Sequence, residues 1–397
     1  MSNPNPAPLR RPLRLMISGG GTGGHIFPAI AIASAVRERL PDAEVLFVGA
    51  EGRMEMTKVP AAGFRIEGLP IRGFQRGAVL ANLGLPWMLL RSFLKARRLV
   101  RSFRPDVAVG VGGYASGPLI AVAQRMGVPT LIQEQNSHAG KTNIHLGRRA
   151  HRICVAYPGM EKYFPKDRLR LTGNPVRSAT VQLEGKRAEA LAHFGLLGDA
   201  PIVLVTGGSL GAAGVHLGAE LVGGLRAEPL GVNLGVAAAL AGWKGAGVQV
   251  IWQTGTPFLE QARKAVADIA FDRCWVSAFI DRMDLAYACA DLVVARAGAI
   301  SISELCLVKL PAVLVPLPTA AEDHQTANAR ALTDRGAALL VRDNDTREEL
   351  GPTVLRLLND APARERMRAA IAAFGRPDAA GTIADEVIAL ANTTTRP

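Results

Sequence analysis

The chain has 397 residues, which is enough for two domains of ordinary size. Apolar residues make up 49% and charged residues 20%, and the 42 Gly and 25 Pro are too few for a fibrous or disordered chain. The net charge of +12 indicates an anionic partner. This charge is uneven, because residues 1–177 carry 26 basic and 10 acidic side chains whereas residues 178–397 carry 20 basic and 24 acidic ones.

The cysteine pattern and the N-terminus indicate the cellular compartment. The four cysteines form no CxxC motif, which favours reduced thiols in the cytoplasm. The first 15 residues contain no apolar run that would serve as a secretion signal. No segment reaches the roughly 20 apolar residues that a membrane-spanning helix needs. We therefore expect a cytoplasmic protein.

Short β-branched runs alternate with helical stretches along the whole chain, a rhythm typical of parallel sheets. The predicted strands of the first half are 13–18, 45–48, 107–110, 130–133, 153–156 and 169–172. The rhythm restarts in the second half with strands at 202–206, 248–252, 274–276, 292–295, 312–315 and 338–341. We predict an α/β protein with two Rossmann-like, doubly wound parallel-sheet domains that face each other across a cleft.

The domain boundary is expected near residue 177, after Gly173-Asn174-Pro175. The first domain would then comprise residues 1–177 and the second residues 178–375. A break at Gly375-Arg376-Pro377 predicts that the last helix, within 376–393, crosses back onto the first domain. Residues 212–247 are rich in Gly and Ala and have no clear periodicity.

A glycine-rich loop follows the first predicted strand and precedes a helix. Gly19 to Gly24 are followed by His25, and such a turn exposes backbone N–H groups that suit a phosphate. The loop also satisfies GxGxxG, and Glu51 after the second strand would then be the ribose acid of a nicotinamide-dependent dehydrogenase. The additional glycines and the histidine argue against this dehydrogenase alternative.

Further loops lie at other predicted strand ends, at 110–118, 134–136 and 207–212. Together with the loop at 19–24, the loops at 110–118 and 134–136 make three in the basic half, and they favour a second anion site over tight packing alone. His25, at the end of the first glycine-rich loop, is either a proton acceptor, a phosphate ligand or a polar residue that only orders its own loop. Glu134 is a base, a sugar ligand or an internal salt-bridge partner.

In the second half, the segment 296–304 is a glycine turn that opens a helix and offers N–H donors to phosphate. Glu304 either chelates a ribose diol or reaches back in a capping box with Ser301 as the N-cap. A polar cluster at 322–325 would line the same cleft. The triplet Asp343-Asn344-Asp345 is interpreted as a solvated loop and no metal site is expected.

Basic residues are densest at 72–104, where no acidic residue occurs between Glu67 and Asp106. Apolar residues from Leu80 to Leu94 precede and interleave the cations, a pattern typical of a helix that lies on anionic lipid. The alternatives are a surface helix that packs on the sheet and an RNA-binding segment. Few aromatic residues are available to stack on bases, so no nucleic-acid partner is expected.

The motif set resembles the MurG family of peptidoglycan glycosyltransferases. It comprises GGGTGGH at 19–25, GVGGYASGP at 110–118, QEQN at 133–136, GNPVR at 173–177, GGSLGA at 207–212, FID at 279–281, RAGAISISE at 296–304 and DHQTANA at 323–329. The resemblance implies a GT-B fold and transfer of N-acetylglucosamine, with inversion, from UDP-N-acetylglucosamine to the C4 hydroxyl of the muramyl sugar of lipid I. Another GT-B enzyme, a UDP-N-acetylglucosamine epimerase or a glycolipid glycosyltransferase, is the alternative.

The same resemblance implies a set of substrate contacts. Glu304 would hold the ribose, Ile280 would present its backbone to uracil and Gln325 would contact the sugar. The implied donor contacts are Thr22, Gly23, Gly24, Asn136, Arg177, Ser209, Ile280, Ala299, Ile300, Ser301, Ile302, Ser303, Glu304 and Gln325. The implied acceptor contacts are Gly21, His25 and Tyr114, and the candidates for the catalytic base are His25 and Glu134.

No metal or cofactor is expected, since helix N-termini and Arg177 suffice to stabilise a leaving diphosphate. The expected partners are UDP-N-acetylglucosamine, lipid I, an anionic membrane surface, and other proteins of cell-wall synthesis and division. The expected location is peripheral, on the cytoplasmic face of the bacterial inner membrane. The sequence departs from the family at Leu210, where Gln is common, at Trp252, where His is common, and by a longer stretch at 212–247.

Overall fold

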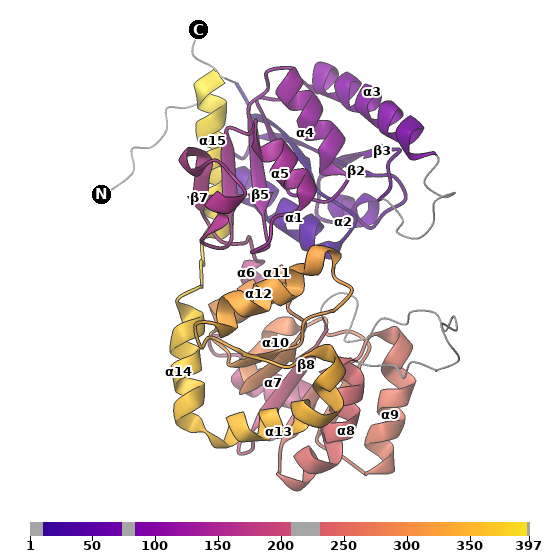
Figure 1. Ribbon diagram of the computed structural model, residues 1–397, viewed down its shortest axis with the longest axis vertical. Coiled ribbons are helices and arrows are strands. Elements are labelled where there is room, and N and C mark those ends of the chain that lie inside the picture. The colour runs from indigo at the N-terminus through magenta and orange to yellow at the C-terminus, as the bar shows by residue number, and fades with distance from the viewer. Residues whose placement is uncertain (1–10, 74–83, 208–230, 395–397) are drawn as a thin grey trace. The chain divides into compact units, whose positions relative to one another are not determined.

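The computed structural model describes residues 11–73, 84–207 and 231–394. The chain divides into two compact units, each an α/β domain around a parallel sheet (Figure 1). Unit 1 comprises Met1–Val176 and Asp378–Pro397, and unit 2 comprises Arg177–Pro377. Each unit has its own sheet, core and helices.

Among the described residues, the sheet of unit 1 has seven parallel strands in the order β3-β2-β1-β4-β5-β6-β7. The strands are β1 (Arg14–Ser18), β2 (Glu44–Ala50), β3 (Arg65–Leu69), β4 (Val107–Gly110), β5 (Thr130–Glu134), β6 (Arg152–Val155) and β7 (Leu169–Leu171). Sequence reasoning missed β3, because this edge strand is only partly buried and its sequence, RIEGL, lacks an apolar run. The other six strands agree with the prediction within a few residues.

Alternate residues of β1 build two different cores, because successive side chains of a strand point to opposite faces. Leu15 and Ile17 pack into a cluster with buried residues of α1 and α15. Met16 belongs to the cluster on the other face, with buried residues of α3, α4 and α5. The helices of unit 1 are α1 (Gly23–Arg39), α2 (Glu55–Ala61), α3 (Leu85–Phe103), α4 (Ser116–Arg125), α5 (Lys141–Gly147) and α15 (Ala379–Thr394).

Helix α15 comes from the C-terminal end of the chain but belongs to unit 1 (Figure 1). Ile383, Val387 and other apolar residues of α15 are buried in the same cluster as α1. At the rim of this contact, Arg39 Nε lies 2.6 Å from Asp385 Oδ1 and Arg152 Nε lies 3.0 Å from Glu386 Oε2. Apolar burial and ion pairs therefore both hold the last helix on unit 1.

The sheet of unit 2 has six parallel strands among the described residues, in the order β10-β9-β8-β11-β12-β13. The strands are β8 (Ile202–Thr206), β9 (Gln249–Gln253), β10 (Cys274–Ser277), β11 (Leu292–Ala295), β12 (Ala312–Leu314) and β13 (Leu339–Leu340). The helices are α6 (Ser178–Val181), α7 (Arg187–Phe194), α8 (Val232–Gly245), α9 (Leu259–Asp268), α10 (Met283–Cys289), α11 (Ala299–Val308), α12 (His324–Thr333), α13 (Thr346–Asn359) and α14 (Ala361–Ala372).

Both sheets reverse their strand order at a corresponding place. In unit 1 the first strand lies between β2 and β4, and in unit 2 the first strand, β8, lies between β9 and β11. Ligands of doubly wound folds bind beyond the carboxyl ends of the strands at such a switch point. The loops that follow β1 and β4, and those that follow β8 and β11, are therefore where a site is expected.

Candidate active site

The glycine loop after β1 is hydrogen-bonded to a buried carboxylate, Glu55, that was not predicted from the sequence. Glu55, at the start of α2, is 1% exposed and accepts hydrogen bonds from Ala50 N–H (3.0 Å) and from Gly21 N–H (3.2 and 3.3 Å). A side chain at Gly20 would collide with this carboxylate. One loop N–H is thus already satisfied by an internal anion, so a ligand phosphate must use other groups of the loop.

The dehydrogenase alternative required Glu51 as the ribose acid, but Glu51 is engaged elsewhere. Its Oε1 lies 3.1 Å from Lys95 Nζ of α3, and the Glu51 side chain is half exposed.

His25 lies in the first turn of α1, where the loop joins the helix. Its Nδ1 is 3.1 Å from Oγ1 of Thr22, the N-cap residue. The opposite edge of the ring faces the second glycine loop, because a Cβ on Gly112 would lie 2.9 Å from His25 Cδ2 and 3.1 Å from Nε2. Gly112 also has a positive φ of 95°, so both the space and the backbone conformation require glycine there.

The loop after β4 meets the loop after β1 at two more points. Gly113, with φ of 77°, packs against the Gly20 carbonyl oxygen, and the Tyr114 ring packs against Gly21 and Gly73. Burial raises the pKa of Tyr114. The implied acceptor contacts Gly21, His25 and Tyr114 are thus brought together by two loops about 90 residues apart in sequence.

Glu134, at the end of β5, is 2% exposed and organises the loop that follows it. Its carboxylate accepts hydrogen bonds from the N–H groups of Asn136 (3.0 Å) and Gly140 (3.1 Å), from Asn136 Nδ2 (3.3 Å) and from Asn143 Nδ2 (2.8 Å). Burial raises the pKa of Glu134, although these hydrogen bonds act to lower it. The salt-bridge alternative is wrong, because all four donors are amides.

Two polar residues beside Glu134 were not singled out from the sequence. Asn143 of α5 donates a hydrogen bond to Glu134. Its amide nitrogen also lies near Gly112, on the side where the His25 ring packs. Asn174 accepts a hydrogen bond from Gln133 Nε2 and donates one to the Gln135 backbone, both at 3.0 Å. These long-range contacts fix the loop after β5, and no local pattern indicates them.

In unit 2, Glu304 and Arg177 come close together although they are 127 residues apart in sequence. Glu304 lies in α11, half-buried, and its Oε2 accepts a 2.9 Å hydrogen bond from the hydroxyl of Tyr287 in α10. Burial raises the pKa of Glu304 to about 7, while the Tyr287 hydrogen bond and the Arg177 charge act to lower it. Arg177 immediately precedes α6 and is exposed.

The capping-box alternative for Ser301 and Glu304 is wrong. Helix α11 begins at Ala299 with Gly298 as its N-cap, and no side chain caps it. Ser301 lies inside the first turn, and Glu304 bonds Tyr287 instead of a helix N–H group. The residues of the implied donor segment, Ala299 to Glu304, are thus the first six residues of α11.

Of the remaining implied donor contacts in the second half, two lie in described loops or helices and one lies outside the described residues. Ile280 is buried beside the exposed Phe279, in the loop after β10. Gln325, near the start of α12, accepts a 3.0 Å hydrogen bond from Leu317 N–H at its Oε1. Ser209 and Leu210 lie outside the described residues.

In the triplet at 343–345, which was expected to be solvated, Asn344 is exposed but Asp343 is not. The Asp343 side chain is 9% exposed and pairs with Arg296, which also donates to the carbonyl oxygens of Val315 and Pro316 at 3.3 Å. Arg296 thereby ties together the loops that follow β11, β12 and β13. Among the residues that the structure describes, no cluster of His, Cys, Asp and Glu is arranged to hold a metal ion.

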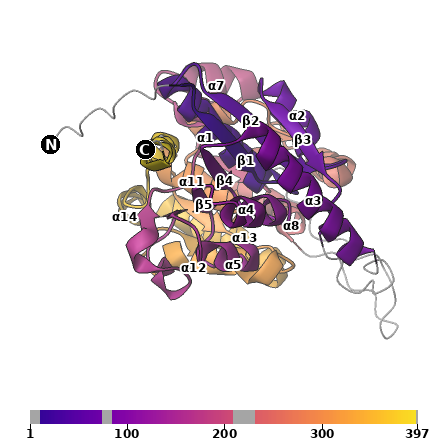
Figure 2. The same cartoon turned by 90° about the horizontal axis from the view of Figure 1, so that it is seen from above.

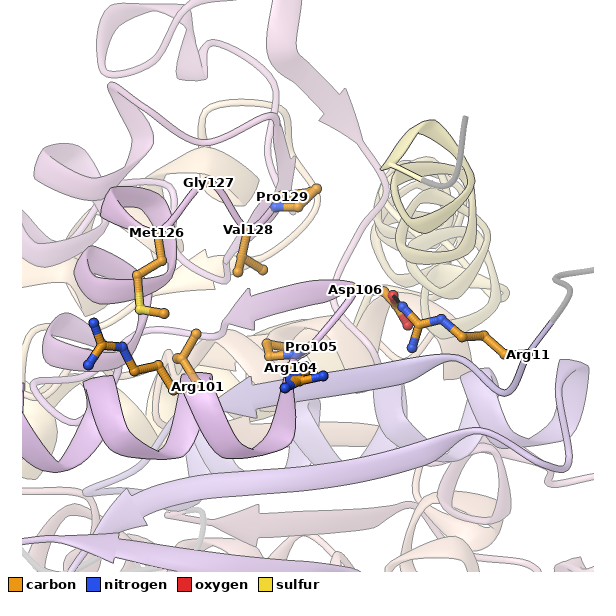
Figure 3. A pocket seen from close by; sticks show the side chains of 10 residues that line it. Arg11, Arg101, Arg104, Pro105, Asp106, Met126, Gly127, Val128 and Pro129 are labelled. Atoms are coloured by element: carbon orange, nitrogen blue, oxygen red, sulfur yellow. Dashed lines mark hydrogen bonds and ion pairs between the residues drawn. The ribbon is translucent and has the colours of Figure 1, made fainter. Parts of the chain in front are cut away.

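A surface groove of about 460 Å³ in unit 1 lies at the amino ends of β4 and β5 (Figure 3). It is lined by Arg101, Arg104, Met126 and residues that precede β4 and β5, where α3 and α4 end. The carboxylate of Asp106 in this groove pairs with Arg11 at 2.5 Å and accepts a hydrogen bond from the Arg14 backbone N–H at 2.8 Å. The groove lies at the amino ends of β4 and β5, whereas doubly wound folds bind ligands beyond the carboxyl ends of the strands, so we do not place the active site there.

Comparison with known proteins identifies the family. The glycosyltransferase family 28 N-terminal domain matches residues 15–155, and the family 28 C-terminal domain matches residues 202–383. A Porphyromonas gingivalis protein named UDP-N-acetylglucosamine–N-acetylmuramyl-(pentapeptide) pyrophosphoryl-undecaprenol N-acetylglucosamine transferase is 50% identical over 94% of this chain and 95% of its own length. A protein of the same name from Parabacteroides distasonis is 48% identical over 95% of this chain and 98% of its own length.

The chain belongs to the MurG family of glycosyltransferases.

The solved structures agree with this membership. Acinetobacter baumannii MurG superposes with a TM-score of 0.73 and 28% identity, over 95% of this chain and all of that one. A putative UDP-N-acetylglucosamine 2-epimerase from Listeria monocytogenes has a TM-score of 0.66 over 98% of this chain and 99% of its own, with only 15% identity, and shares the fold alone. The fold is GT-B, as predicted.

At Trp252, where MurG proteins commonly have His, the structure shows a buried residue in a polar contact. Its ring is fully buried, and its Nε1 donates a 3.0 Å hydrogen bond to Asn233 Oδ1 of α8. Asn233 Nδ2 in turn donates to the Thr254 carbonyl oxygen at 2.9 Å. The indole N–H thus serves as the donor to α8, and Trp252 is a packing residue of unit 2.

Proposed function

We propose that this chain transfers N-acetylglucosamine from UDP-N-acetylglucosamine to the C4 hydroxyl of the muramyl sugar of lipid I, which yields lipid II for peptidoglycan. The observation that carries this proposal is the 50% identity over 94% of the chain to a relative named for this reaction. The family's motifs are also present in order from GGGTGGH at residue 19 to DHQTANA at residue 323.

Unit 2 is the proposed donor domain. The N-terminus of α11 offers N–H groups and a positive dipole end to the diphosphate, and Arg177 adds a positive charge nearby. These groups stabilise the negative charge that grows on UDP as it leaves. Glu304 would accept hydrogen bonds from the ribose, Gln325 would contact the sugar, Ile280 would meet uracil, and Ser209 would meet the diphosphate.

Unit 1 is the proposed acceptor domain, and His25 is the proposed catalytic base. The attacking hydroxyl must lose a proton as the new glycosidic bond forms and the bond from the anomeric carbon to UDP breaks. Glu134 is less suited to take that proton, because its two carboxylate oxygens already accept four hydrogen bonds. We therefore assign Glu134 the role of a positioning residue for Asn136 and Asn143.

Thr22 would orient His25 through the 3.1 Å contact between its Oγ1 and His25 Nδ1, and Nε2 is the nitrogen proposed to take the proton. Gly21 and Tyr114 would border the acceptor pyrophosphate, and Thr22, Gly23 and Gly24 would contact the donor. Because Gly21 N–H is bonded to Glu55, the first-turn N–H groups of α1 are the better anion donors in this loop.

Helix α3 is the proposed membrane-docking face of unit 1 (Figure 2). Trp87, Leu90 and Leu94 are 64%, 49% and 59% exposed and lie at helical spacing on one face. Arg91, Arg97 and Arg98 flank them and are also exposed. The packed-helix alternative fits Phe93 and Ala96, which contact the core, but it does not fit exposed apolar residues such as Trp87.

Three residues of the predicted membrane stretch, Arg76, Leu80 and Leu83, lie outside the described residues. No helix in the described part of the chain is long and apolar enough to span a bilayer. We propose a peripheral location on the cytoplasmic face of the inner membrane, where lipid I would be reached together with other proteins of cell-wall synthesis and division.

The test uses the full chain with radiolabelled UDP-N-acetylglucosamine and a soluble lipid I analogue. The expected result is a labelled disaccharide lipid and an equal amount of UDP. A parallel reaction without acceptor separates the alternative, since an epimerase would convert the donor sugar there. No transfer to the acceptor, with folding confirmed by circular dichroism, would overturn the proposal.

A further inference from the structure

The contact between Tyr287 and Glu304 joins two helices of unit 2. The tyrosine hydroxyl of α10 lies 2.9 Å from Oε2 of the glutamate in α11, and Tyr287 is 2% exposed. A buried hydroxyl needs a hydrogen-bond partner, so this contact by itself shows only that the Tyr287 hydroxyl has one. Three further features point to a role in nucleotide binding.

Helix α10 is anchored at both ends, so its tyrosine hydroxyl is held in place. At its start, Asp284 pairs with Lys186 Nζ at 2.8 Å and with Arg282 Nε at 2.9 Å, and these two cations hold the pKa of Asp284 well below its usual range. At its end, Arg187 Nη1 donates to the Cys289 carbonyl oxygen at 3.1 Å. The Tyr287 hydroxyl thus belongs to a helix, α10, that has little freedom to shift.

The hydrogen bond uses only one of the two carboxylate oxygens. Among the described residues no hydrogen bond reaches Oε1 of Glu304, and the side chain is only half-buried. A carboxylate held by one oxygen on a rigid donor presents the other oxygen in a defined direction. Such preorganisation increases affinity by lowering the entropy lost when a ligand hydroxyl binds.

The hydrogen bond also favours the charged carboxylate. Burial works against ionisation of Glu304, whereas a donor to Oε2 stabilises the anion. A charged carboxylate accepts stronger hydrogen bonds than a neutral acid does. The tyrosine therefore favours both the orientation and the protonation state that a ribose hydroxyl needs.

We propose that Tyr287 is a positioning residue for nucleotide recognition, which orients Glu304 so that its Oε1 accepts hydrogen bonds from the donor ribose. This inference rests on the proposed function, in which Glu304 holds the ribose. It adds a residue that has no direct contact with the ligand. Tyr287 would act on donor affinity and not on the proton transfer at His25.

The experiment measures binding of two ligands by isothermal titration calorimetry at pH 8, UDP-N-acetylglucosamine and its 2′,3′-dideoxyribose analogue. The variants of the full chain are Tyr287→Phe, Glu304→Gln and the double variant. Tyr163→Phe is the matched control, because it removes a hydroxyl from a comparable contact, 2.9 Å from His138 Nδ1 in unit 1. The melting temperature of each variant is recorded alongside.

We expect Tyr287→Phe to weaken binding of the ribose ligand by roughly ten-fold, as loss of a hydrogen bond to a charged group does, and to leave the dideoxy ligand within about two-fold. In the double variant, Tyr287→Phe should cause little further loss of affinity for UDP-N-acetylglucosamine beyond that caused by Glu304→Gln. It should also move the acidic limb of the affinity-against-pH curve to higher pH, since the hydrogen bond that lowers the Glu304 pKa is gone. Tyr163→Phe should change none of these quantities.

Equal weakening of both ligands, or no weakening of either, would overturn the role of Tyr287. The two failures are distinguishable. If Glu304→Gln itself does not discriminate between ribose and dideoxyribose, the proposed role of Glu304 is wrong. If Glu304→Gln weakens binding of the ribose ligand more than that of the dideoxyribose ligand and Tyr287→Phe does not, only the inference about Tyr287 is wrong.

Discussion

The two units share a strand order but use their carboxylates differently. In unit 1, Glu55 and Glu134 are buried and accept backbone and amide N–H groups of the glycine-rich loops. In unit 2, helix α11 begins at an uncapped glycine, and Glu304 keeps one oxygen free of hydrogen bonds among the described residues. In this chain the carboxylates of unit 1 are therefore structural, because their oxygens are saturated, whereas Glu304 has an oxygen available for a ligand.

The largest effect is expected from His25, the proposed base in unit 1. His25→Ala should lower kcat by more than about 100-fold, because general base catalysis contributes that much. Affinity for UDP-N-acetylglucosamine, which unit 2 would bind, should stay within about two-fold. Steady-state transfer kinetics and calorimetry measure both quantities. Retained kcat would remove His25 from the mechanism and return Glu134 as the candidate.

Glu134→Ala tests whether the saturated carboxylate is structural. It leaves the N–H groups of Asn136 and Gly140 and the amide of Asn143 without their acceptor, so we expect the free energy of unfolding to fall by about 1–3 kcal/mol. Urea denaturation measures it. Glu51→Ala is the control, since its exposed pair with Lys95 should be worth less than about 1 kcal/mol. Equal costs would contradict the structural role.

Gly112→Ala separates backbone strain from displacement of His25. The substitution places a Cβ 2.9 Å from His25 Cδ2 at a φ of 95°, so we expect a loss of about 1–2 kcal/mol in stability and a fall in kcat of about ten-fold. Gly127→Ala is the control, because φ is 76° there but nothing lies within 4 Å of the new Cβ. It should cost stability and leave kcat unchanged. A similar fall in kcat for both variants would disprove the His25 contact.

In unit 2 the pH dependence of donor binding tests Glu304. Burial raises its pKa to about 7, so the carboxyl is mostly protonated at pH 6 and mostly ionised at pH 8. Because the ionised form is the better acceptor for ribose hydroxyls, affinity for UDP-N-acetylglucosamine should rise by up to about ten-fold between these values. Calorimetry across this range measures it. Glu304→Gln should give a flat profile, and a slope that survives this substitution belongs to another group.

The smallest effect is expected at the surface of α3. Arg98→Gln should weaken binding to vesicles with anionic lipid by about five-fold, since each cation near such a surface contributes about 1 kcal/mol. Vesicle sedimentation at low and high salt measures it. Arg149→Gln, at an exposed position of unit 1 outside α3, is the matched control. Binding that ignores both salt and the charges at Arg91, Lys95 and Arg98 would refute membrane docking through this helix.

Local patterns were sufficient to predict twelve of the strands and the family. Buried parallel strands read as continuous apolar runs, and the glycine turns that follow them are marked by composition alone. Strand β3 escaped because an edge strand needs no such run. The capping box at Ser301 was a sound local pattern, but it failed because the Tyr287 hydroxyl and not a helix N–H group meets Glu304 in the folded unit.

The two α/β halves, their different charge and the motif order of the MurG family can all be predicted from local sequence patterns. The partners of the carboxylates cannot be predicted in this way, because they depend on the folded chain. Glu55 reaches Gly21 across 34 residues, Glu304 meets Tyr287 across 17, and Asp343 pairs with Arg296 across 47. Such partners are set by how helices pack over the sheet, which brings distant residues within hydrogen-bond distance and leaves no trace in local spacing.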